Sequence, residues 1–449
     1  MSFSEIIIIV GQFFLSLSLL IVLHELGHFI PAKLFKTKVE KFFLFFDVKF
    51  SLVEKKIGET VYGIGWLPLG GYVKISGMID ESMDKEQLAK PPQPWEFRSK
   101  PAWQRLIIML GGVFVNIVLA WIIYVGMAFV WGDKDLASSE FKDAVEVSSF
   151  LEQTLGLQTG DEFVSLDNEP VTSFNQLRSN LLLADQVTIK RDGELKQIQI
   201  PEDFLSQLID DEPESLIRLR YPFVITKIPK DSHNANVGLE EGDIIAAVNG
   251  NDTRYTADVL PYLEEGKTTI LNVTIDRKGE TLQKELKLEN GKLALVHGGV
   301  SITDLGRLGF YNLTTQEYNL VESFSAGTKR FKEQFANFGK QLKKLVNPKT
   351  GAYKGLGSFI SIAKIFPTSW DWQAFWNITA FLSIMLGVLN LLPIPALDGG
   401  HAMFLVYELV ARRKPSDKFL EYAQMVGFVL LITLFVYAFG NDIYRHFIK

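Results

Sequence analysis

The chain has 449 residues, too many for one ordinary domain; hydrophobic residues make up 47% of it and charged residues 22%. With a mean hydropathy of +0.13, this composition predicts membrane spans joined to soluble domains. The formal net charge of -6 excludes the basic field that nucleic-acid binding needs, so no nucleic-acid partner is expected. The absence of cysteine excludes disulfides, cysteine-ligated metals and thiol nucleophiles, which leaves His, Asp and Glu as metal ligands.

Four stretches are apolar enough and long enough to cross a bilayer as helices, which takes about 20 residues. They cover residues 6–30, 106–131, 375–397 and 422–439. No basic region precedes the first stretch and no small-residue cleavage site follows it, so we expect a retained span rather than a signal peptide.

Lysine and arginine near the span ends predict the orientation, because short basic loops stay in the cytoplasm. They gather after the first span, before the second, and between the third and the fourth: Lys33, Lys36, Lys38, Lys41, Arg98, Lys100, Arg105, Arg412, Arg413, Lys414 and Lys418. These loops are expected to be cytoplasmic, and residues 132–371 and both termini to lie outside. Arg445 and Lys449 weakly oppose this orientation.

The first span ends in the sequence His-Glu-Leu-Gly-His, with His24 and His28 one turn apart on one helix face. Two imidazoles at this spacing can bind one zinc ion, which activates water for attack on a peptide carbonyl, and Glu25 is the candidate catalytic base. Ionisable groups at the end of an apolar span are costly unless they are paired, hydrated or bound to a metal. The alternative is a helix-end cluster that only meets lipid headgroups.

An apolar, glycine-rich and strand-like stretch follows at residues 61–78, on the predicted cytoplasmic side. A sheet edge at this place can hold an extended substrate by strand addition. Such help is needed because a helix keeps its carbonyls hydrogen-bonded, so cleavage inside a membrane requires local unwinding. The alternative is a plain cytosolic hairpin.

The long outer stretch contains an internal repeat. The pattern Gly-Leu-x-x-Gly-Asp at residues 156–161 recurs at residues 238–243, an offset of 82 (238 − 156). Each copy continues into an alternating apolar strand that ends in Gly, at residues 187–193 and 273–279. The pattern resembles a pair of PDZ domains, which bind an extended peptide at a sheet edge. The alternative is two small β-rich domains with no peptide ligand.

After the repeat, apolar residues recur at intervals of three, four or seven: Phe324, Phe331, Phe335, Phe338, Leu342 and Leu345. The opposite face is basic, with Lys329, Arg330, Lys332, Lys340, Lys343 and Lys344. The two faces predict either an amphipathic helix on the membrane surface or a helix that packs its aromatic stripe on the repeats.

The third span ends in Asn-Leu-Leu-Pro-Ile-Pro-Ala-Leu-Asp-Gly-Gly-His at residues 390–401. Pro393 and Pro395 break the helix and free backbone groups at membrane depth, which needs a cavity lined by protein or water. Asp398 is therefore the candidate third zinc ligand and His401 the rival one. Helix capping is the alternative role of Asp398.

These motifs together resemble the site-2 protease family of intramembrane zinc metalloproteases. The resemblance rests on the His-Glu-Leu-Gly-His motif, the distant Asn-x-x-Pro-x-Pro-x-Leu-Asp-Gly motif and the repeats between them. Residues 62–77, 97–105 and 361–364 match as well, so the likeness covers nearly the whole chain. One departure is Gly111-Gly112, where relatives commonly have Gly-Pro.

The resemblance implies one zinc ion per chain, bound by His24, His28 and Asp398, with Glu25 as the catalytic glutamate. It also implies that residues 61–78 form a re-entrant β-hairpin near the zinc. The residues expected to bind substrate are Asn390, Gly70, Gly71, Tyr72 and Val73.

The predicted fold class is a multi-pass α-helical membrane protein with four transmembrane helices, two extracytoplasmic α+β PDZ domains and a membrane-associated β-hairpin. The predicted parts are transmembrane helices at 1–35, 106–131, 372–400 and 422–449, cytoplasmic segments at 36–105 and 401–421, PDZ domains at 132–224 and 225–306, and an amphipathic membrane-surface segment at 307–371.

The expected activity is cleavage of single-pass membrane proteins inside their transmembrane segments, after a site-1 protease has cut their outer domain. The resemblance implies a bacterial inner membrane, periplasmic PDZ domains, an active site toward the cytoplasm, and an anti-sigma factor of a stress response or leftover signal peptides as substrates.

A membrane-tethered PDZ scaffold with an inactive metal site is one alternative, but it gives no reason for the two zinc motifs to coexist. A metal transporter is another, but residues 106–131 and 422–439 carry no ionisable group of the kind it would need.

Overall fold

The computed structural model describes residues 2–68, 70–78, 91–213, 215–263, 269–298 and 302–445. The chain divides into two compact units. The first comprises Met1–Gly132, Glu317–Lys343 and Lys354–Lys449, and the second comprises Asp133–Gln316 and Lys344–Tyr353. Position 69 of the predicted hairpin and positions 264–268 and 299–301 of the predicted second PDZ domain lie outside the described residues.

Four helices of the first unit are long and apolar enough to cross a membrane, as the sequence predicts. They are α1 (Phe3–Leu34), α3 (Ala102–Trp131), α11 (Trp372–Leu391) and α13 (Asp417–Ile443). The third ends six residues before its predicted end at residue 397, because Pro393 cannot continue a helix. The unit also contains η1 (Phe97–Ser99), α10 (Phe359–Ala363) and α12 (Asp398–Ala411). Helix α9 (Leu320–Val346), most of which belongs to this unit, and η5 (Ala352–Gly355) cross the unit boundary.

Helices α1 and α3 approach so closely that glycine is needed where they cross. A Cβ atom on Gly27 would overlap the backbone of Gly111, and a Cβ atom on Gly111 would overlap the carbonyl of Gly27. Small residues of this kind allow close packing of helices in a membrane, where no hydrophobic effect drives them together. The crossing therefore fixes α3 against the segment of α1 that carries His24 and His28.

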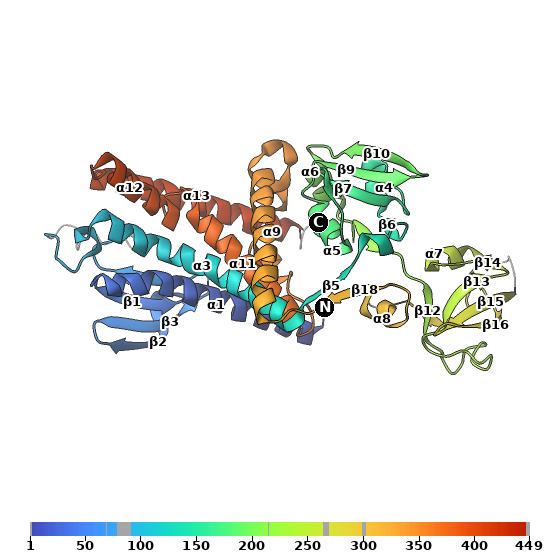
Figure 1. The fold of residues 1–449 in the computed structure, drawn as a ribbon. Coiled ribbons are helices and arrows are strands. Elements are labelled where there is room, and N and C mark those ends of the chain that lie inside the picture. The colour runs from blue at the N-terminus through green and yellow to red at the C-terminus, as the bar shows by residue number, and fades with distance from the viewer. Residues whose placement is uncertain are drawn as a thin grey trace. The chain divides into compact units, whose positions relative to one another are not determined.

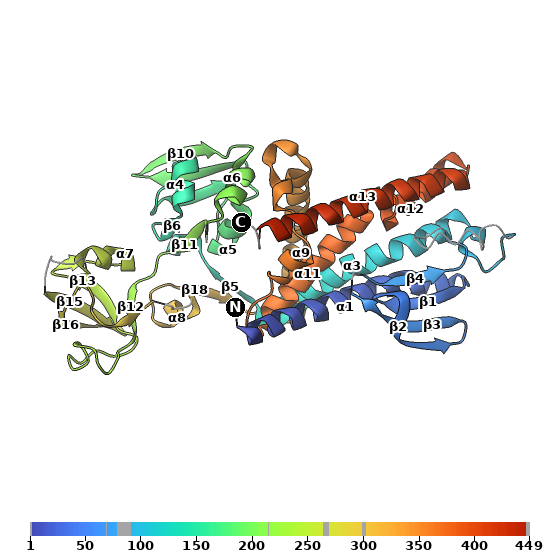
Figure 2. The same cartoon turned by 180° about the vertical axis from the view of Figure 1, so that it is seen from behind.

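A four-stranded sheet beside α1 has the order β2-β3-β1-β4 (Figure 2). Its strands are β1 (Val39–Leu44), β2 (Phe46–Ile57), β3 (Thr60–Leu67) and β4 (Tyr72–Ile75). The predicted hairpin over residues 61–78 is wrong in its pairing: β3 and β4 lie on opposite sides of β1, and the hairpin is instead formed by β2 and β3. Strand β1 takes the central position because Val39 and Phe43 are buried. One consequence is that β4 forms an edge of the sheet.

Residues 401–421 were expected to be a loop, but most of helix α12 lies there. The prolines end α11, yet the residues after Leu397 start a second helix that buries Ala402 and Leu405, and Leu405 packs with Ile108 and Met109 of α3. An ion pair between Arg105 Nη2 and Glu408 Oε1, at 2.5 Å, joins α3 to the far part of α12.

Helix α9 crosses α3 near the C-terminal end of α3 (Figures 1 and 2). Gly327 lies against the backbone of Val125, and the indole of Trp121 donates a hydrogen bond of 2.9 Å to Thr328 Oγ1. Phe331 and Phe338 pack into a cluster with side chains of α3 and α11. Only part of the aromatic stripe is thus covered, because Phe324 and Phe335 stay exposed.

The second unit holds the two repeats as sheets of similar order. The first copy has the order β10-β9-β7-β8, and the second has β16-β15-β13-β12-β17 with β14 on β13. Strands β6 and β11 form a separate pair, and β5 pairs with β18, so the chain enters and leaves the unit through adjacent strands.

The strands of the second unit are β5 (Asp133–Leu136), β6 (Val145–Val147), β7 (Glu162–Leu166), β8 (Glu169–Pro170), β9 (Gln186–Arg191), β10 (Glu194–Gln199), β11 (Ile217–Leu219), β12 (Phe223–Lys227), β13 (Ile244–Val248), β14 (Asn251–Asp252), β15 (Ile270–Arg277), β16 (Glu280–Lys287), β17 (Val296–His297) and β18 (Leu313–Gln316). Its helices are η2 (Ser138–Glu140), α4 (Ser149–Leu155), α5 (Phe174–Asn180), α6 (Phe204–Asp211), α7 (Thr256–Val259), η3 (Leu260–Leu263), α8 (Ile302–Arg307) and η4 (Pro348–Thr350).

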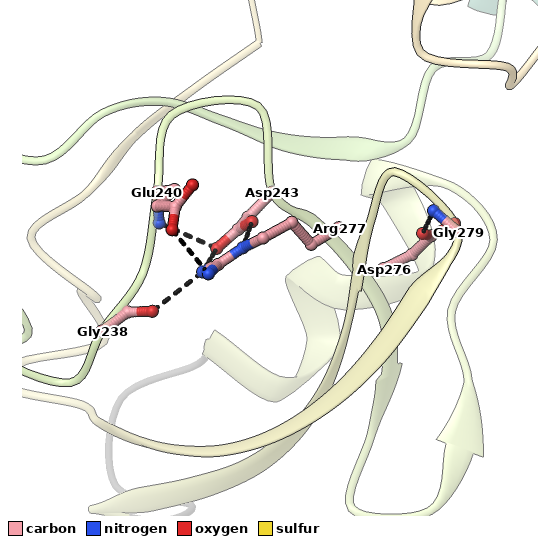
Figure 3. Close-up of polar contacts among 6 residues, drawn as sticks. All are labelled: Gly238, Glu240, Asp243, Asp276, Arg277 and Gly279. Carbon is pink, nitrogen blue, oxygen red and sulfur yellow. Dashed lines mark hydrogen bonds and ion pairs between the residues drawn. The ribbon is translucent and has the colours of Figure 1, made fainter.

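An arginine at the end of a later strand, β9 in the first copy and β15 in the second, closes the Gly-Leu-x-x-Gly-Asp turn. In the second copy the guanidinium of Arg277 donates to both carboxylate oxygens of Asp243 at 2.7 and 2.8 Å, to Gly238 O and to Glu240 Oε1 (Figure 3). In the first copy Arg191 makes the corresponding bonds to Asp161 and Gly156 O. The hydrogen bonds that the two arginines donate to these aspartates raise the pKa of both arginines. The repeated sequence therefore encodes a repeated turn clamp.

Candidate metal centre and active site

Three side chains from distant parts of the chain meet beside the α1–α3 crossing. His24 Nε2 lies 3.4 Å and His28 Nε2 3.3 Å from Asp398 Oδ2, and the two Nε2 atoms are 3.3 Å apart. Each residue offers one ligand atom, and these atoms all lie within 4.8 Å of one another. His401, the rival ligand, is not a member of this group, which was found among the described residues.

The cluster fits a zinc ion. Two imidazole nitrogens and one carboxylate oxygen are a zinc donor set that leaves one position for water or substrate. The Oδ2 atom of Asp398 has no hydrogen-bond partner among the described residues, although it is buried and faces both imidazoles. A buried carboxylate oxygen without a donor needs a cation in the same place.

The outer nitrogens of both histidines face α3. His28 Nδ1 lies 2.8 Å from the carbonyl oxygen of Ile108, and His24 Nδ1 lies 3.0 Å from Nδ2 of Asn116. Gly112, between these two residues on α3, faces the rings themselves, since a Cβ atom there would overlap both imidazoles. Gly112 thus lies directly against the two predicted histidine ligands.

A tight turn between α11 and α12 positions Asp398. Ala396 has a φ of +92°, a conformation that non-glycine residues rarely adopt. A Cβ atom on Gly399 would overlap the carbonyl of Leu391, and one on Gly400 would overlap the carbonyl of Ile394. The glycine pair therefore lets α12 start against the end of α11, with Asp398 in its first turn.

Glu25 is buried between the histidines and the sheet. A Cβ atom on Gly71, just before β4, would lie 3.5 Å from Glu25 Cγ. Gly71, Tyr72 and Val73 line the same cavity as Glu25, so the predicted base lies beside the edge strand of the sheet.

A cavity of roughly 590 Å³ opens over the cluster. Its walls include the three predicted ligands, Glu25, His401 and, from the sheet edge, Gly71, Tyr72 and Val73. Two predicted substrate-binding residues are not part of the wall: Gly70 lies beside the ring of Phe46, and Asn390 lies near the end of α11.

One side of the cavity is polar. Asp47 accepts hydrogen bonds from Lys41 Nζ at 2.7 Å and from the Tyr72 hydroxyl at 2.8 Å. Burial acts to raise the pKa of Asp47, but these two hydrogen bonds outweigh it and hold the pKa below its usual value. Tyr72 also stacks on Phe43 and Phe46, which fixes its ring at the cavity wall.

Sequence reasoning missed Asn116 and the role of Gly112. The signal for Asn116 was present, because an amide in the middle of an apolar span needs a partner. The signal for Gly112 was noted only as a departure from relatives, since its contact with the histidines depends on how α1 and α3 cross.

Comparison with known proteins gives a family match over most of the chain. The family model of peptidase family M50 matches residues 12–434. The chain belongs to peptidase family M50. The relatives of this M50 peptidase include the "Regulator of sigma E protease" of Haemophilus influenzae, 27% identical, with 97% of this chain and 98% of the relative covered.

Two further relatives are each 28% identical. A "Putative zinc metalloprotease" of Xylella fastidiosa covers 95% of this chain and 97% of its own length, and one of Campylobacter jejuni covers 96% and 92%. The M50 peptidase is therefore a zinc-dependent metalloprotease and, given its four spanning-length helices, a membrane protein. The predicted family, enzyme class and cofactor are confirmed.

Proposed function

We propose that this M50 peptidase cleaves peptide bonds inside the transmembrane segments of single-pass membrane proteins. The observation that carries the proposal is the convergence of His24 and His28 on α1, which is itself long enough to span, with Asp398 on the neighbouring helix α12. A protease with its ligands on or next to spanning helices needs a substrate that reaches the same depth.

The roles of the site residues follow from their chemistry. His24, His28 and Asp398 would hold the zinc ion, which when bound polarises a carbonyl and lowers the pKa of water. Glu25 accepts the proton of the attacking water at its carboxylate and passes it to the leaving amine. Glu25 lines the same cavity as the three proposed ligands, so its carboxylate can reach a water molecule held there.

The edge of strand β4 is the proposed substrate-binding surface. A peptide that adds to this edge is extended, so its carbonyls are free of helical hydrogen bonds. A Cβ atom on Gly71 would lie 3.5 Å from Glu25 Cγ, which places the proton acceptor near Gly71 along the edge. The scissile bond of an added peptide would therefore lie near Gly71, with Tyr72 and Val73 supplying neighbouring backbone groups. A Cβ atom on Gly71 would overlap Ile21 and the carbonyl of Phe43, so glycine is required there.

The two repeats are proposed to be PDZ domains that exclude substrates with bulky outer domains. In this view a site-1 protease trims the substrate first, and the M50 peptidase cuts second. The name of the Haemophilus influenzae relative supports an anti-sigma factor of a stress response as one substrate, with leftover signal peptides as another. The basic loops support a bacterial inner membrane with the repeats outside and the zinc toward the cytoplasm.

The test is cleavage of a purified single-span substrate in detergent, with and without its outer domain, followed by mass spectrometry of the products. We expect a cut inside the span of the trimmed substrate, loss of the cut after removal of zinc by a chelator, and recovery when zinc is added back. Cleavage only outside the span would overturn the proposed function.

A further inference from the structure

Asn116 is a fully buried amide in the middle of α3 that plays no part in the proposed chemistry. A buried amide costs free energy unless it is hydrogen-bonded. Its Nδ2 atom lies 3.0 Å from His24 Nδ1, and among the described residues its Oδ1 atom has no hydrogen-bond partner.

The other ring nitrogen of His24 decides which group donates in this contact. His24 Nε2 is the atom that faces Asp398, at 3.4 Å, so it is the atom available to a metal. A neutral imidazole that binds a metal through Nε2 carries its proton on Nδ1, and this N–H needs an acceptor. An amide nitrogen only donates, whereas an amide oxygen accepts.

His28 provides an independent comparison in the same cluster. Its Nδ1 atom lies 2.8 Å from the carbonyl of Ile108, which can only accept, so the proton of His28 lies on Nδ1 and its Nε2 is free to face Asp398 at 3.3 Å. Ile108 and Asn116 lie eight residues apart on α3, and their histidines lie four apart on α1. Helix α3 thus meets both outer nitrogens.

We propose that Asn116 is a positioning residue for the zinc site. It presents its amide oxygen to His24, accepts the Nδ1–H and so fixes the tautomer in which Nε2 faces the metal. A rotation of 180° about its Cβ–Cγ bond exchanges Nδ2 and Oδ1 without moving the backbone. The inference rests on the proposed ligand role of His24.

The backbone around Asn116 is held on two sides. The hydroxyl of Ser383 in α11 donates a hydrogen bond of 2.7 Å to the carbonyl oxygen of Asn116. One turn earlier, Gly112 lies directly against the imidazoles. The amide is therefore kept at hydrogen-bonding distance from His24 by contacts that do not involve its own side chain.

The test is the zinc affinity of the purified full-length protein, measured by competition with a chelator. Asn116→Leu removes the acceptor at similar size and should weaken zinc binding about 10- to 100-fold, as loss of a ligand's partner typically does. Asn116→Asp keeps an acceptor and should stay within about threefold of the parent. Thr379→Val is the matched control, because it removes a fully buried polar group of α11 that bonds Ser16 Oγ, eight residues before His24, and it should also stay within about threefold.

A second measurement detects the Nδ1 proton of His24 directly. In zinc-loaded protein with 15N-labelled histidine, we expect a slowly exchanging Nδ1–H on His24 that Asn116→Leu loses and Asn116→Asp retains. If Asn116→Leu does not fold, Asn116→Ala carries the same test without added bulk. Parent-like zinc affinity in the variant that lacks an acceptor, or an equal loss in Asn116→Asp, would overturn the proposal. Neither readout uses a substrate, so a failure of the proposed cleavage would not be confused with a failure of this inference.

Discussion

In the second unit the buried carboxylates of Asp161 and Asp243 each pair with an arginine 30 or 34 residues further along the chain (191 − 161 and 277 − 243). In the first unit the buried carboxylate of Asp398 faces a histidine 370 residues away (398 − 28). The first arrangement occurs twice at corresponding positions and closes a local turn. The second occurs once and joins the two ends of the chain.

The difference in partners separates a structural pair from a metal site. A guanidinium neutralises its aspartate by itself, with all carboxylate oxygens bonded. Imidazoles that bind a metal are neutral, so they leave the charge of Asp398 for the ion to balance. Removing one partner should therefore have different consequences in the two units.

The largest effect is expected from Asp398. Asp398→Ala should lose nearly all bound zinc and all cleavage, whereas His401→Ala should keep the metal, because His401 lines the cavity without joining the ligand group. Metal content by mass spectrometry of both purified variants measures this. Zinc retained after Asp398→Ala but absent after His401→Ala would assign the third ligand to His401.

A large effect is also expected from one methyl group on α3. Gly112→Ala places a Cβ atom on both imidazoles and should lower zinc affinity more than about tenfold, since overpacking of this kind costs about 1–3 kcal/mol. Gly126→Ala is the matched control, because a Cβ atom there meets nothing within 4 Å. Chelator competition measures the zinc affinity of both variants. Equal affinities would mean that α1 and α3 move apart freely at their crossing.

Removing the repeats should change selectivity rather than chemistry. Deletion of residues 145–289 keeps the paired strands β5 and β18, so the remaining ends stay together. We expect the shortened protein to cut a substrate with its full outer domain, and to cut a trimmed substrate at the rate of the intact protein. Continued rejection of the long substrate would move the filter to another segment, such as α9.

The smallest effect is expected from the turn clamp of the first repeat. Arg191→Gln leaves Asp161 buried without its cation and should lower the unfolding temperature of the second unit by roughly 3–10 °C, with zinc content unchanged. Arg218→Gln is the control, because its contact with Glu146 is 3.7 Å long and exposed. A loss of zinc in Arg191→Gln would contradict the separation of the two units' roles.

The sequence was sufficient for features that depend on spacing along one helix or on composition. The helical register of His24 and His28 and the hydropathy of the four spans required no tertiary information. The repeat was also visible, although the arginines that complete its turns were not identified as partners. Asp398 could be proposed because prolines beside an aspartate are unusual at membrane depth.

Features that depend on crossing geometry could not be predicted. Strand β3 pairs with β1 rather than with β4. Strand β1 lies between the two because its residues Val39 and Phe43 are buried, and this burial is a tertiary feature. Helix α12 was not predicted, because the two prolines before it suggested a loop. The contacts of Asn116 and Gly112 with the histidines exist only because α1 and α3 cross at Gly27 and Gly111.

The most direct measurement compares zinc content and cleavage in one sample of Glu25→Gln. We predict zinc content equal to that of the parent, because the three ligands survive, and a rate of span cleavage lower by at least about 100-fold, because the proton acceptor is lost. Parent-like cleavage by the zinc-loaded variant would mean that Glu25 and the zinc cluster do not form one catalytic site.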